Sequence, residues 1–373
     1  MSRKKILIIS SGYYPTISPR SFRTTELSRE LARQGHYVKV IIPYQNGIDY
    51  SQLTKTTGVE FKDLGRERFG QLDIKKNKKL ILVRRIINRL LLMFFEFPDI
   101  QFSPLVVQAL KKENNYDLLI SIAVPYPIHW GVAYSRSSKH RIAKTWVADC
   151  GDPYMGDRID TFRKLFYFKY VEKWFCRKAD YLSIPVKEAI EGYYREFHYK
   201  IRIIPQGFKF KRINFPEKVY NNPITFAYAG NIVPFNRDPR PFLDYLCGVN
   251  IDFRFIIYTK KIDLIINYKR FLKDKLVIRD YIPRDELLEI LVRMDFLINF
   301  DNNTAIHSPS KLIDYALTRR PVLNITKDLD KSVISAFLNR DYSGAYKIED
   351  IENYQISNVA GKFLKLSEYL KKS

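Results

Sequence analysis

Residues 6–42 read ILIISSGYYPTISPRSFRTTELSRELARQGHYVKVII and set the architecture of the chain. The apolar run at 6–9 is typical of a strand that is covered on both faces of a parallel sheet. A polar loop leads into a helix at 21–34, and Gly35 is placed to end that helix. A second apolar run at 38–42 completes a strand, loop, helix and strand. This unit predicts a parallel α/β fold.

The same unit recurs along the chain. In the first half we expect further strands at 117–122, 143–148, 181–184 and 201–204, with helices at 128–137 and 161–177. In the second half we expect strands at 224–229, 253–258, 276–278, 296–300 and 322–325, and a last amphipathic helix at 359–370. The fold class is therefore α/β, with two doubly wound Rossmann-like domains that face each other across a cleft.

A segment rich in proline and asparagine separates the two series. Residues 214–223 contain two prolines and three asparagines and form the best linker candidate. The predicted domains are 1–213 and 224–373, and the last helix could pack back on the N-terminal domain. The length of 373 residues agrees with two domains.

Composition excludes several classes of protein. With 46% hydrophobic residues the chain can fill ordinary cores, which excludes a disordered or fibrous protein. The cysteines are odd in number and widely spaced, which argues against disulfides or a zinc site and for a reducing compartment; they are Cys150, Cys176 and Cys247.

The apolar run at 6–9 is too short for a signal peptide, and no stretch of about 20 apolar residues predicts a membrane-spanning helix. We expect a cytoplasmic location.

The charge is unusual, with 63 Lys and Arg against 40 Asp and Glu, a net charge of +23. This excess favours a polyanionic partner, either nucleic acid or an anionic membrane, unless it only reflects a lysine-rich genome. A nucleic-acid-binding protein is the weaker alternative, because zinc-finger spacing, an RNP-like aromatic run and a helix-turn-helix pattern are all missing. No G-x-G occurs among the 15 glycines, which disfavours a dinucleotide-dependent oxidoreductase.

One basic segment predicts membrane contact. Residues 62–89 hold ten Lys or Arg and three Asp or Glu, a net charge of +7. In a helix at 80–95, Arg84, Arg85 and Arg89 share one side, and most apolar residues lie on the other. Such a helix suits the interface of an anionic membrane, on its cytoplasmic face. The alternative is a helix that packs on the N-terminal sheet with its arginines in water.

The strongest chemical signal lies at the start of a helix near residue 310. Ser308 is a good N-cap, and a proline follows it at the first helical position. The amides of Ser310 and Lys311, with the helix dipole, would bind an anion. Asp314 lies one turn further on, where its carboxylate could accept two hydrogen bonds from a ribose diol. The alternative is a well-capped helix with a surface lysine and aspartate.

Five segments together resemble family 4 glycosyltransferases of the GT-B fold. The segment SPSKLIDYALTRRPVL at 308–323 resembles their nucleotide-sugar-binding helix. Residues 9–40 resemble the opening unit, and IIPQG at 203–207 resembles the V-I-P-N-G that closes the N-terminal domain. YAGN at 228–231 resembles the glycine loop of the C-terminal domain, and DYIP at 280–283 resembles the G-x-V-P that meets the base. The order of the segments matches the family.

The resemblance implies a set of donor-binding residues. In addition to Ser308, Ser310, Lys311 and Asp314, these are Gly12, Gly230, Asn231, Lys260, Tyr281 and Ile282. The chain departs from the family pattern at two acids and one arginine. Ile306 stands at the first acid of the usual E-x7-E motif, and Asp314 replaces the second glutamate. Asn231 replaces a customary arginine, which leaves Arg237 or Lys260 to neutralise the diphosphate.

The resemblance also implies a reaction, retaining glycosyl transfer from a nucleoside-diphosphate sugar without a metal or other cofactor. Arg237 and the amides near residue 310 would stabilise the leaving diphosphate. Asp152 belongs to a DCGDP segment that resembles D-x-R-D-P-W, and it would lie near the reacting sugar or else stabilise a proline turn. Arg20 and Arg23 would bind a phosphate of a lipid-linked acceptor or else be surface charges.

Two further groups have structural alternatives. His129 could face the cleft, although a structural histidine is the stronger interpretation. Asp328 and Asp330 form the one DxD pattern, which we expect to be a solvated turn rather than a metal site. The predicted role is that of a hexosyltransferase, peripheral at the inner face of the cell membrane, in polysaccharide or lipopolysaccharide synthesis. Ile306 and Asn231 keep a GT-B-like sugar-nucleotide epimerase or a noncatalytic scaffold as alternatives.

Overall fold

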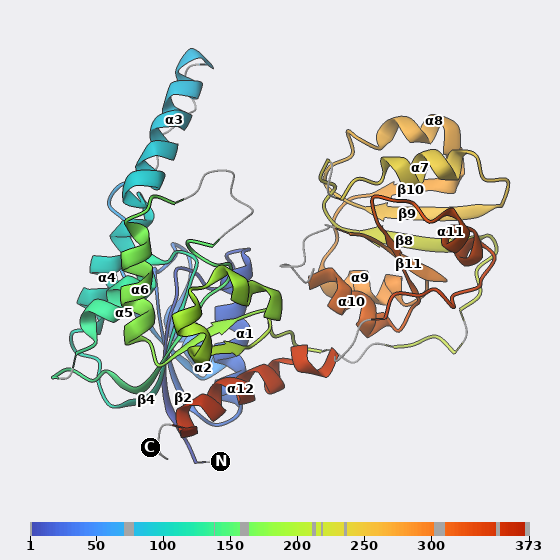
Figure 1. The fold of residues 1–373 in the computed structure, drawn as a ribbon. Helices are drawn as coiled ribbons and strands as arrows, with labels where there is room; N and C mark the ends of the chain where they lie inside the picture. Colours follow the sequence, from blue (N-terminus) through green and yellow to red (C-terminus); the bar gives the residue numbers. More distant parts are fainter. Residues whose placement is uncertain are drawn as a thin grey trace. The chain divides into compact units, whose positions relative to one another are not determined.

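The computed structural model describes residues 2–70, 78–137, 139–156, 164–210, 214–217, 219–234, 237–301, 310–347 and 351–369. The side chains of residues 78–82, 310–311 and 369 are not among the described ones. The chain folds into two compact units (Figure 1). Unit 1 comprises Met1–Lys209 and Asn353–Ser373, and unit 2 comprises Phe210–Glu352.

Unit 1 is built on a seven-stranded parallel sheet with the order β3-β2-β1-β4-β5-β6-β7. The strands are β1 (Lys5–Ile9), β2 (Tyr37–Ile42), β3 (Val59–Asp63), β4 (Tyr116–Ile122), β5 (Ala143–Asp149), β6 (Tyr181–Ile184) and β7 (Ile201–Ile203). The apolar run of β1 lies between β2 and β4, where both faces are covered, as its sequence predicts. The strand β3 lies at one edge of the sheet, and charged residues alternate with apolar ones along most of it. It was not predicted from the sequence.

Helices cover both faces of this sheet. They are α1 (Pro19–Arg33), α2 (Tyr50–Thr57), α4 (Phe102–Leu110), α5 (Pro127–Ser135), α6 (Phe168–Lys178) and α12 (Ile356–Tyr369). Ser18 caps α1 by accepting a hydrogen bond from the Ser21 amide, and Pro19 opens the helix. The described part of α6 begins at Phe168, so the expected helix start near 161 is wrong for residues 164–167. Lys164 instead reaches the buried carboxylate of Glu96.

The helix α3 (Lys78–Phe95) stands away from the sheet of unit 1 (Figure 1). None of its described side chains is buried, and Val83, Ile86, Ile87, Leu90 and Phe94 expose between 39% and 51% of their surface. The alternative in which this helix packs its apolar side on the N-terminal sheet is therefore wrong. The base of the helix is fixed, because Tyr154 donates a hydrogen bond of 3.0 Å to the carboxylate of Glu96.

No single helix in the described part of the chain has both the length and the hydropathy that a membrane span requires. The segments Val83–Phe95 and Asp99–Leu110, bent by 40° at their junction, satisfy those two criteria only as a pair. The second of these segments contains α4, which buries Phe102, Val106 and Leu110 and packs against α5.

Unit 2 is a smaller α/β unit with a five-stranded parallel sheet of order β10-β9-β8-β11-β12. Its strands are β8 (Ile224–Ala229), β9 (Phe253–Tyr258), β10 (Leu276–Arg279), β11 (Phe296–Phe300) and β12 (Val322–Ile325). Its helices include α7 (Arg240–Cys247), α8 (Lys269–Leu272), α9 (Arg284–Leu291), α10 (Ser310–Thr318) and α11 (Lys331–Leu338). Stacked aromatic rings fill its core, with Phe226 at 4.5 Å from Phe296 and 4.9 Å from Phe255.

The last helix returns to unit 1. α12 packs on α1 and buries Val359, Phe363 and Leu364 in the unit 1 core. The division between the units falls at Lys209 and again at Glu352, whereas the expected linker lay at 214–223 and the expected second domain ran to residue 373. The leaving and returning segments pair within unit 1, since the amide of Phe208 donates to the carbonyl of Tyr354 at 2.8 Å.

Candidate functional site

The predicted donor-binding residues of unit 2 gather at one edge of its sheet. Gly230 and Asn231 follow β8, Lys260 follows β9, and Tyr281 follows β10. Because these strands are parallel, all three loops lie at the carboxyl edge of the sheet. Ligands of doubly wound sheets bind at this edge, where neighbouring strands connect in opposite directions. Here that point lies between β8 and β11, and α10 follows β11.

Tyr315 fastens α10 to this edge. Its side chain is buried, and its hydroxyl accepts a hydrogen bond of 2.9 Å from the amide of Ala229, the residue before Gly230. Burial raises the pKa of Tyr315, so the hydroxyl stays neutral. Tyr315 was not among the residues predicted from the sequence, although it lies one residue after Asp314. The contact sets the position of the helix start relative to the glycine loop.

Asp314 is held by an arginine that was not predicted from the sequence. The Nε of Arg284, at the start of α9, donates to Oδ1 of Asp314 at 2.8 Å. The carboxylate is 18% exposed, and burial raises its pKa although Arg284 acts in the opposite direction. A sugar hydroxyl at this position would meet a carboxylate that a guanidinium already orients.

The other predicted residues of unit 2 are more exposed. The ammonium group of Lys260 lies 5.1 Å from the centre of the Tyr281 ring, and 63% of Tyr281 is exposed. Asn231 is exposed, and its carbonyl accepts a hydrogen bond of 2.9 Å from the hydroxyl of Tyr228. Ile282 and Arg237 are half-buried. These groups form a partly exposed, cationic and aromatic edge.

The predictions on Ser308 and Ile306 lie outside the described residues, as do the side chains of Ser310 and Lys311. The backbone is helical from Ser310 onward, which agrees with the predicted start of the helix near this residue. Asp330 accepts hydrogen bonds from the amides of Ser332 and Val333 and caps α11. The sequence predicted a solvated turn for this residue, and the structure makes it the N-cap of a helix.

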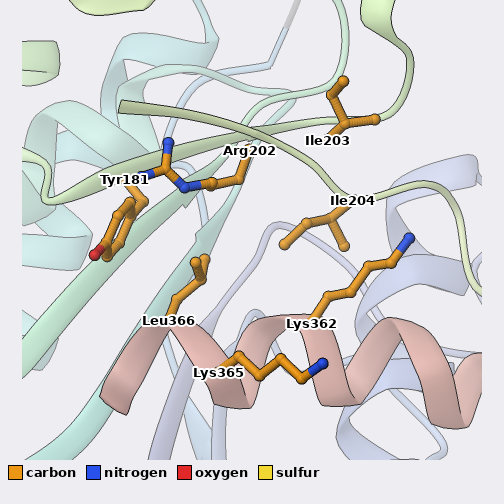
Figure 2. Close-up of a pocket in the computed structure, with 7 residues that line it drawn as sticks. All are labelled: Tyr181, Arg202, Ile203, Ile204, Lys362, Lys365 and Leu366. Atoms are coloured by element: carbon orange, nitrogen blue, oxygen red, sulfur yellow. The ribbon is translucent and has the colours of Figure 1, made fainter. Parts of the chain in front are cut away.

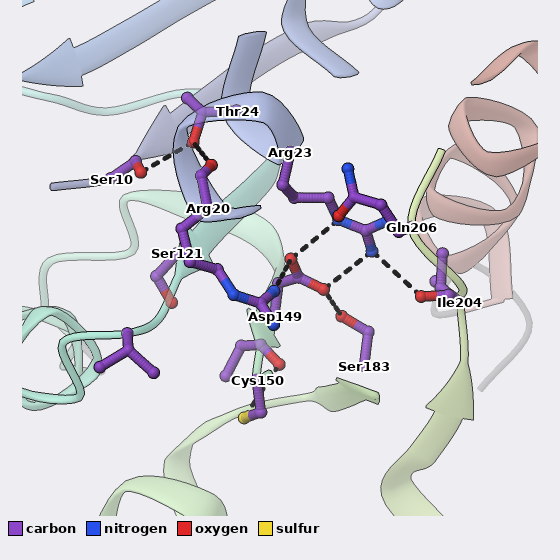
Figure 3. A network of polar contacts seen from close by, with 12 residues as sticks. Ser10, Arg20, Arg23, Thr24, Ser121, Asp149, Cys150, Ser183, Ile204 and Gln206 are labelled. Atoms are coloured by element: carbon purple, nitrogen blue, oxygen red, sulfur yellow. Dashed lines mark hydrogen bonds and ion pairs between the residues drawn. The ribbon is translucent and has the colours of Figure 1, made fainter. Parts of the chain in front are cut away.

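The corresponding edge of unit 1 carries a buried ionic network around Asp149 (Figure 3). Asp149 ends β5, and its two carboxylate oxygens accept hydrogen bonds of 3.0 Å from Nε and Nη2 of Arg23. Ser183 donates a third hydrogen bond of 2.7 Å. Burial alone would raise the pKa of Asp149, but Arg23, Arg20 and Ser183 outweigh it and hold the pKa below its usual value.

Arg23 is an internal residue. Its side chain is 3% exposed, so the alternative that it is a surface charge is wrong. Besides Asp149, it donates to the carbonyls of Ile204, at 3.2 Å, and Pro205. Its guanidinium also lies 5.1 Å from the ring of Phe363 in α12. These contacts join the carboxyl edge of the sheet to the segment by which the chain leaves unit 1.

Arg20 presents a positive charge at the same edge. Its Nη1 lies 3.8 Å from Oδ2 of Asp149, and its side chain is 20% exposed. Its guanidinium lies against Gly151, where an added Cβ would come within 2.0 Å of Nη2 and would displace the end of the Arg20 side chain. Two arginines thus share one carboxylate, and this cluster keeps one net positive charge. A bound anion would balance that charge.

Asp152 and Gly12 lie in the loops of this edge, after β5 and β1. Asp152 is half-buried, and its carbonyl accepts a hydrogen bond of 2.6 Å from the hydroxyl of Tyr126. Gly12 packs tightly on the start of α1, where an added Cβ would lie 2.4 Å from Oγ of Ser21. The contacts of these residues do not test their predicted roles toward a sugar.

His129 is structural. It is fully buried, and its Nδ1 lies 2.8 Å from Oγ of Ser121. Burial lowers the pKa of His129 to about 3, so the ring is neutral at physiological pH. The alternative in which His129 faces a cleft is wrong.

Solved structures share this fold over the whole chain. A glycosyltransferase from Rickettsia africae ESF-5 is 12% identical, with a TM-score of 0.61 and complete coverage of both chains. The lipopolysaccharide outer core galactosyltransferase WaaB is 13% identical, with a TM-score of 0.55 and coverage of 98% of this chain and 99% of that one. Anabaena HepE with UDP and glucose is 12% identical, with a TM-score of 0.53 and 99% coverage of each chain. The two units thus have the GT-B fold of two Rossmann-like domains.

The sequence identifies the family. The model of Glycosyltransferase Family 4 matches residues 22–212, and the chain belongs to this family. A comparison with curated protein sequences gives no match. The predicted fold of two Rossmann-like α/β domains and the predicted glycosyltransferase activity are confirmed.

Proposed function

We propose that the enzyme transfers a hexose from a nucleoside-diphosphate sugar, with retention and without a metal ion, to a lipid-linked glycan acceptor in surface polysaccharide or lipopolysaccharide synthesis. The observation that carries this proposal is the contact of α10 with the end of β8, at the carboxyl edge where the loops after β9 and β10 also lie. The crystal structure of HepE in complex with UDP and glucose supports the choice of donor, and the galactosyltransferase WaaB supports the class of product.

The donor would bind at the carboxyl edge of unit 2. The amides at the start of α10 and the cations Lys260, Lys311 and Arg237 supply the positive charge that a diphosphate requires. Asp314, oriented by Arg284, offers carboxylate oxygens to sugar hydroxyls. The exposed ring of Tyr281 offers a flat apolar surface to a base.

The proposed reaction breaks the bond between the anomeric carbon and the phosphate oxygen. The oxygen of an acceptor hydroxyl forms a new bond to the anomeric carbon on the same face, and its proton passes to the departing phosphate oxygen. Arg237 and the α10 amides would stabilise the charge that develops on the diphosphate. Asp152 would interact with the reacting sugar, and Arg20 would bind an anionic group of the acceptor.

Replacing Lys311 or Asp314 tests the donor site. We expect Lys311→Ala and Asp314→Ala each to weaken binding of UDP or GDP about 10-fold, because hydrogen bonds to charged groups contribute about 1.5–3 kcal/mol. Isothermal titration calorimetry measures this change. Lys269→Ala, on the exposed surface of α8, is the matched control and should bind as the parent does.

Two results would count against the donor proposal. If the parent protein bound neither UDP nor GDP nor a related nucleotide, the proposed donor site would be abandoned. If the enzyme released free or isomerised sugar from the nucleotide without an acceptor, the epimerase alternative would replace transfer. Product analysis by mass spectrometry and NMR distinguishes these reactions.

We also propose that α3 lies on an anionic membrane surface. Its exposed apolar residues and its three arginines have the distribution of an interfacial helix. The helix base is anchored through Glu96 to Tyr154 and Lys164, in the chain that follows Asp152. Membrane binding through α3 would therefore act on the part of unit 1 that holds the proposed acceptor residues.

The triple variant Arg84→Ser, Arg85→Ser, Arg89→Ser tests membrane binding. We expect its affinity for vesicles containing phosphatidylglycerol to fall about 100-fold, because each basic residue near such a surface contributes about 1 kcal/mol. Sedimentation with vesicles measures the change. The control Lys111→Ser, Lys112→Ser, Arg141→Ser removes the same charge from exposed positions elsewhere in unit 1. Equal losses in both triple variants would show that only total charge matters.

A further inference from the structure

A groove of about 480 Å³ lies beside the last helix of unit 1 (Figure 2). One wall is formed by the edge strand β7 with its neighbour β6, and the other by α12. Its lining residues are Tyr181, Arg202, Ile203, Ile204, Lys362, Lys365 and Leu366. The volume falls within the range of about 300–1,000 Å³ that is usual for small-molecule sites.

The groove has an apolar floor. Tyr181, Ile204 and Leu366 line it and are at least nine-tenths buried, because they also belong to the core between the sheet and α12. Ile203, at the end of the edge strand, is 43% exposed. An occupant with a short apolar part would therefore cover surface that the fold leaves in contact with water.

The groove also has a basic rim. Arg202, Lys362 and Lys365 contribute three positive charges, and none of the seven lining residues, all within the described chain, is acidic. Arg202 is fixed in place, because Nη1 donates to the carbonyls of Tyr199 and Ile201, each at 2.8 Å. Its guanidinium lies 4.8 Å from the centre of the Tyr181 ring. The planar guanidinium matches phosphate and carboxylate groups.

We propose that this groove is a binding site for an amphiphilic anion, a phosphate or carboxylate group that carries a short apolar chain. The anionic group would lie among Arg202, Lys362 and Lys365, and the chain would cover Ile203 and Leu366. The residues of this site all belong to unit 1 and are separate from those of unit 2 that are proposed to bind the donor.

The groove shares one residue with the buried network of unit 1. The side chain of Ile204 lines the groove, and its carbonyl accepts a hydrogen bond from Arg23. In addition, α12 supplies Lys362 and Lys365 to the groove and Phe363 to the guanidinium of Arg23. An occupant would join β7 to α12, the two elements next to the points where the chain leaves and re-enters unit 1. We expect it to raise the melting temperature of unit 1.

Octyl phosphate, inorganic phosphate and 1-octanol are suitable probes. Calorimetry measures the binding of each probe, with octyl phosphate kept below its micellar concentration. We expect octyl phosphate to bind at least 10-fold more tightly than inorganic phosphate or 1-octanol, each of which has only one of its two parts. The variant Lys362→Gln, Lys365→Gln should weaken octyl phosphate binding at least 5-fold, and Ile203→Glu should abolish it. The control Lys55→Gln, Lys111→Gln removes two exposed charges elsewhere in unit 1 and should bind as the parent does. Unchanged melting without ligand checks that each variant folds.

Three results would overturn the proposal. The first is that inorganic phosphate and octyl phosphate bind equally well. The second is that the Lys362 and Lys365 variant binds octyl phosphate as the parent does. The third is that the Arg84, Arg85 and Arg89 variant of α3 loses octyl phosphate binding while the groove variant keeps it. Vesicles of phosphatidylglycerol then distinguish the source of the ligand. If the groove variant also loses vesicle binding, the ligand is a lipid headgroup, and if it loses only octyl phosphate, the ligand is a soluble amphiphile. Both of these results support the site.

Discussion

The two sheets carry charged residues at the same edge, where their parallel strands end, but they hold them differently. In unit 1, Arg23 and Asp149 are 3% and 2% exposed and bond to each other, to Ser183 and to backbone carbonyls. In unit 2, Arg284 and Asp314 are 32% and 18% exposed, and Lys260 and Tyr281 lie in solvent. Burial increases the cost of an unpaired charge, while exposure leaves a charge free to exchange water for a ligand. The buried Arg23–Asp149 pair of unit 1 is therefore a fixed support, whereas the charged groups at the unit 2 edge are available for binding.

The variant Asp149→Asn should give the largest effect, on the stability of unit 1. Removing the carboxylate charge leaves Arg23 buried without its ionic partner, which costs about 3–5 kcal/mol. Urea unfolding followed by tryptophan fluorescence measures this loss, because Trp130, Trp146 and Trp174 all lie in unit 1. The stability that Asp149 contributes is present at neutral pH. It is lost in acid, as the pH falls through the lowered pKa of this group.

Asp314→Asn in unit 2 is the matched control. Its ion pair with Arg284 is partly exposed, and such pairs contribute at most about 1 kcal/mol. Calorimetric unfolding of the whole chain measures both variants. A loss in Asp314→Asn as large as that in Asp149→Asn would show that burial does not distinguish the two edges.

Asp149 also shows what the sequence could and could not predict. The apolar runs of β1 and β8 and the helix at Ser310 were predictable, because each depends on neighbouring residues. The pairing of Arg23 with Asp149 joins residues 126 positions apart, and that of Arg284 with Asp314 joins residues 30 apart. Such contacts depend on strand order and on loop conformation, which hydrophobic periodicity does not encode.

The two amphipathic helices α3 and α12 also show a limit of prediction from the sequence. Both have an apolar side and basic residues, and both were recognisable in the sequence. α12 buries Phe363 in the unit 1 core, whereas α3 leaves Ile86 exposed. An amphipathic pattern shows that one side of a helix avoids water, but not what covers that side.

Replacing Glu172 should give the second-largest effect, a change in how the stability of unit 1 depends on pH. It is fully buried on α6, and burial raises its pKa to about 8, more than the amides of Met155 and Tyr154 lower it. In the unfolded chain the same group ionises near pH 4.5. Between these values only the unfolded state loses the proton, so stability falls as the pH rises. The total loss from pH 5 to 8 is on the order of 3 kcal/mol.

Glu172→Gln cannot ionise and should remove this decline. Urea unfolding at pH 5, 6.5 and 8, followed by tryptophan fluorescence, compares the variant with its parent. We expect the variant to be the more stable protein at pH 8, and the difference to vanish near pH 5. A parent whose stability is constant from pH 5 to 8 would contradict the raised pKa of Glu172.

Replacing Tyr281 should give the smallest effect, and this effect should be on the affinity for UDP and not on the stability of the fold. Its ring is exposed next to Lys260, so Tyr281→Ala leaves no cavity and should change unfolding by less than about 0.5 kcal/mol. If a base stacks on this ring, the variant should weaken UDP binding about 5-fold, a change of about 1 kcal/mol. Tyr281→Phe keeps the ring and should bind as the parent does. Tyr281, at the unit 2 edge, would then affect only the affinity for the ligand, whereas Asp149 affects the stability of unit 1. A stability loss in Tyr281→Ala with unchanged UDP affinity would reverse that distinction.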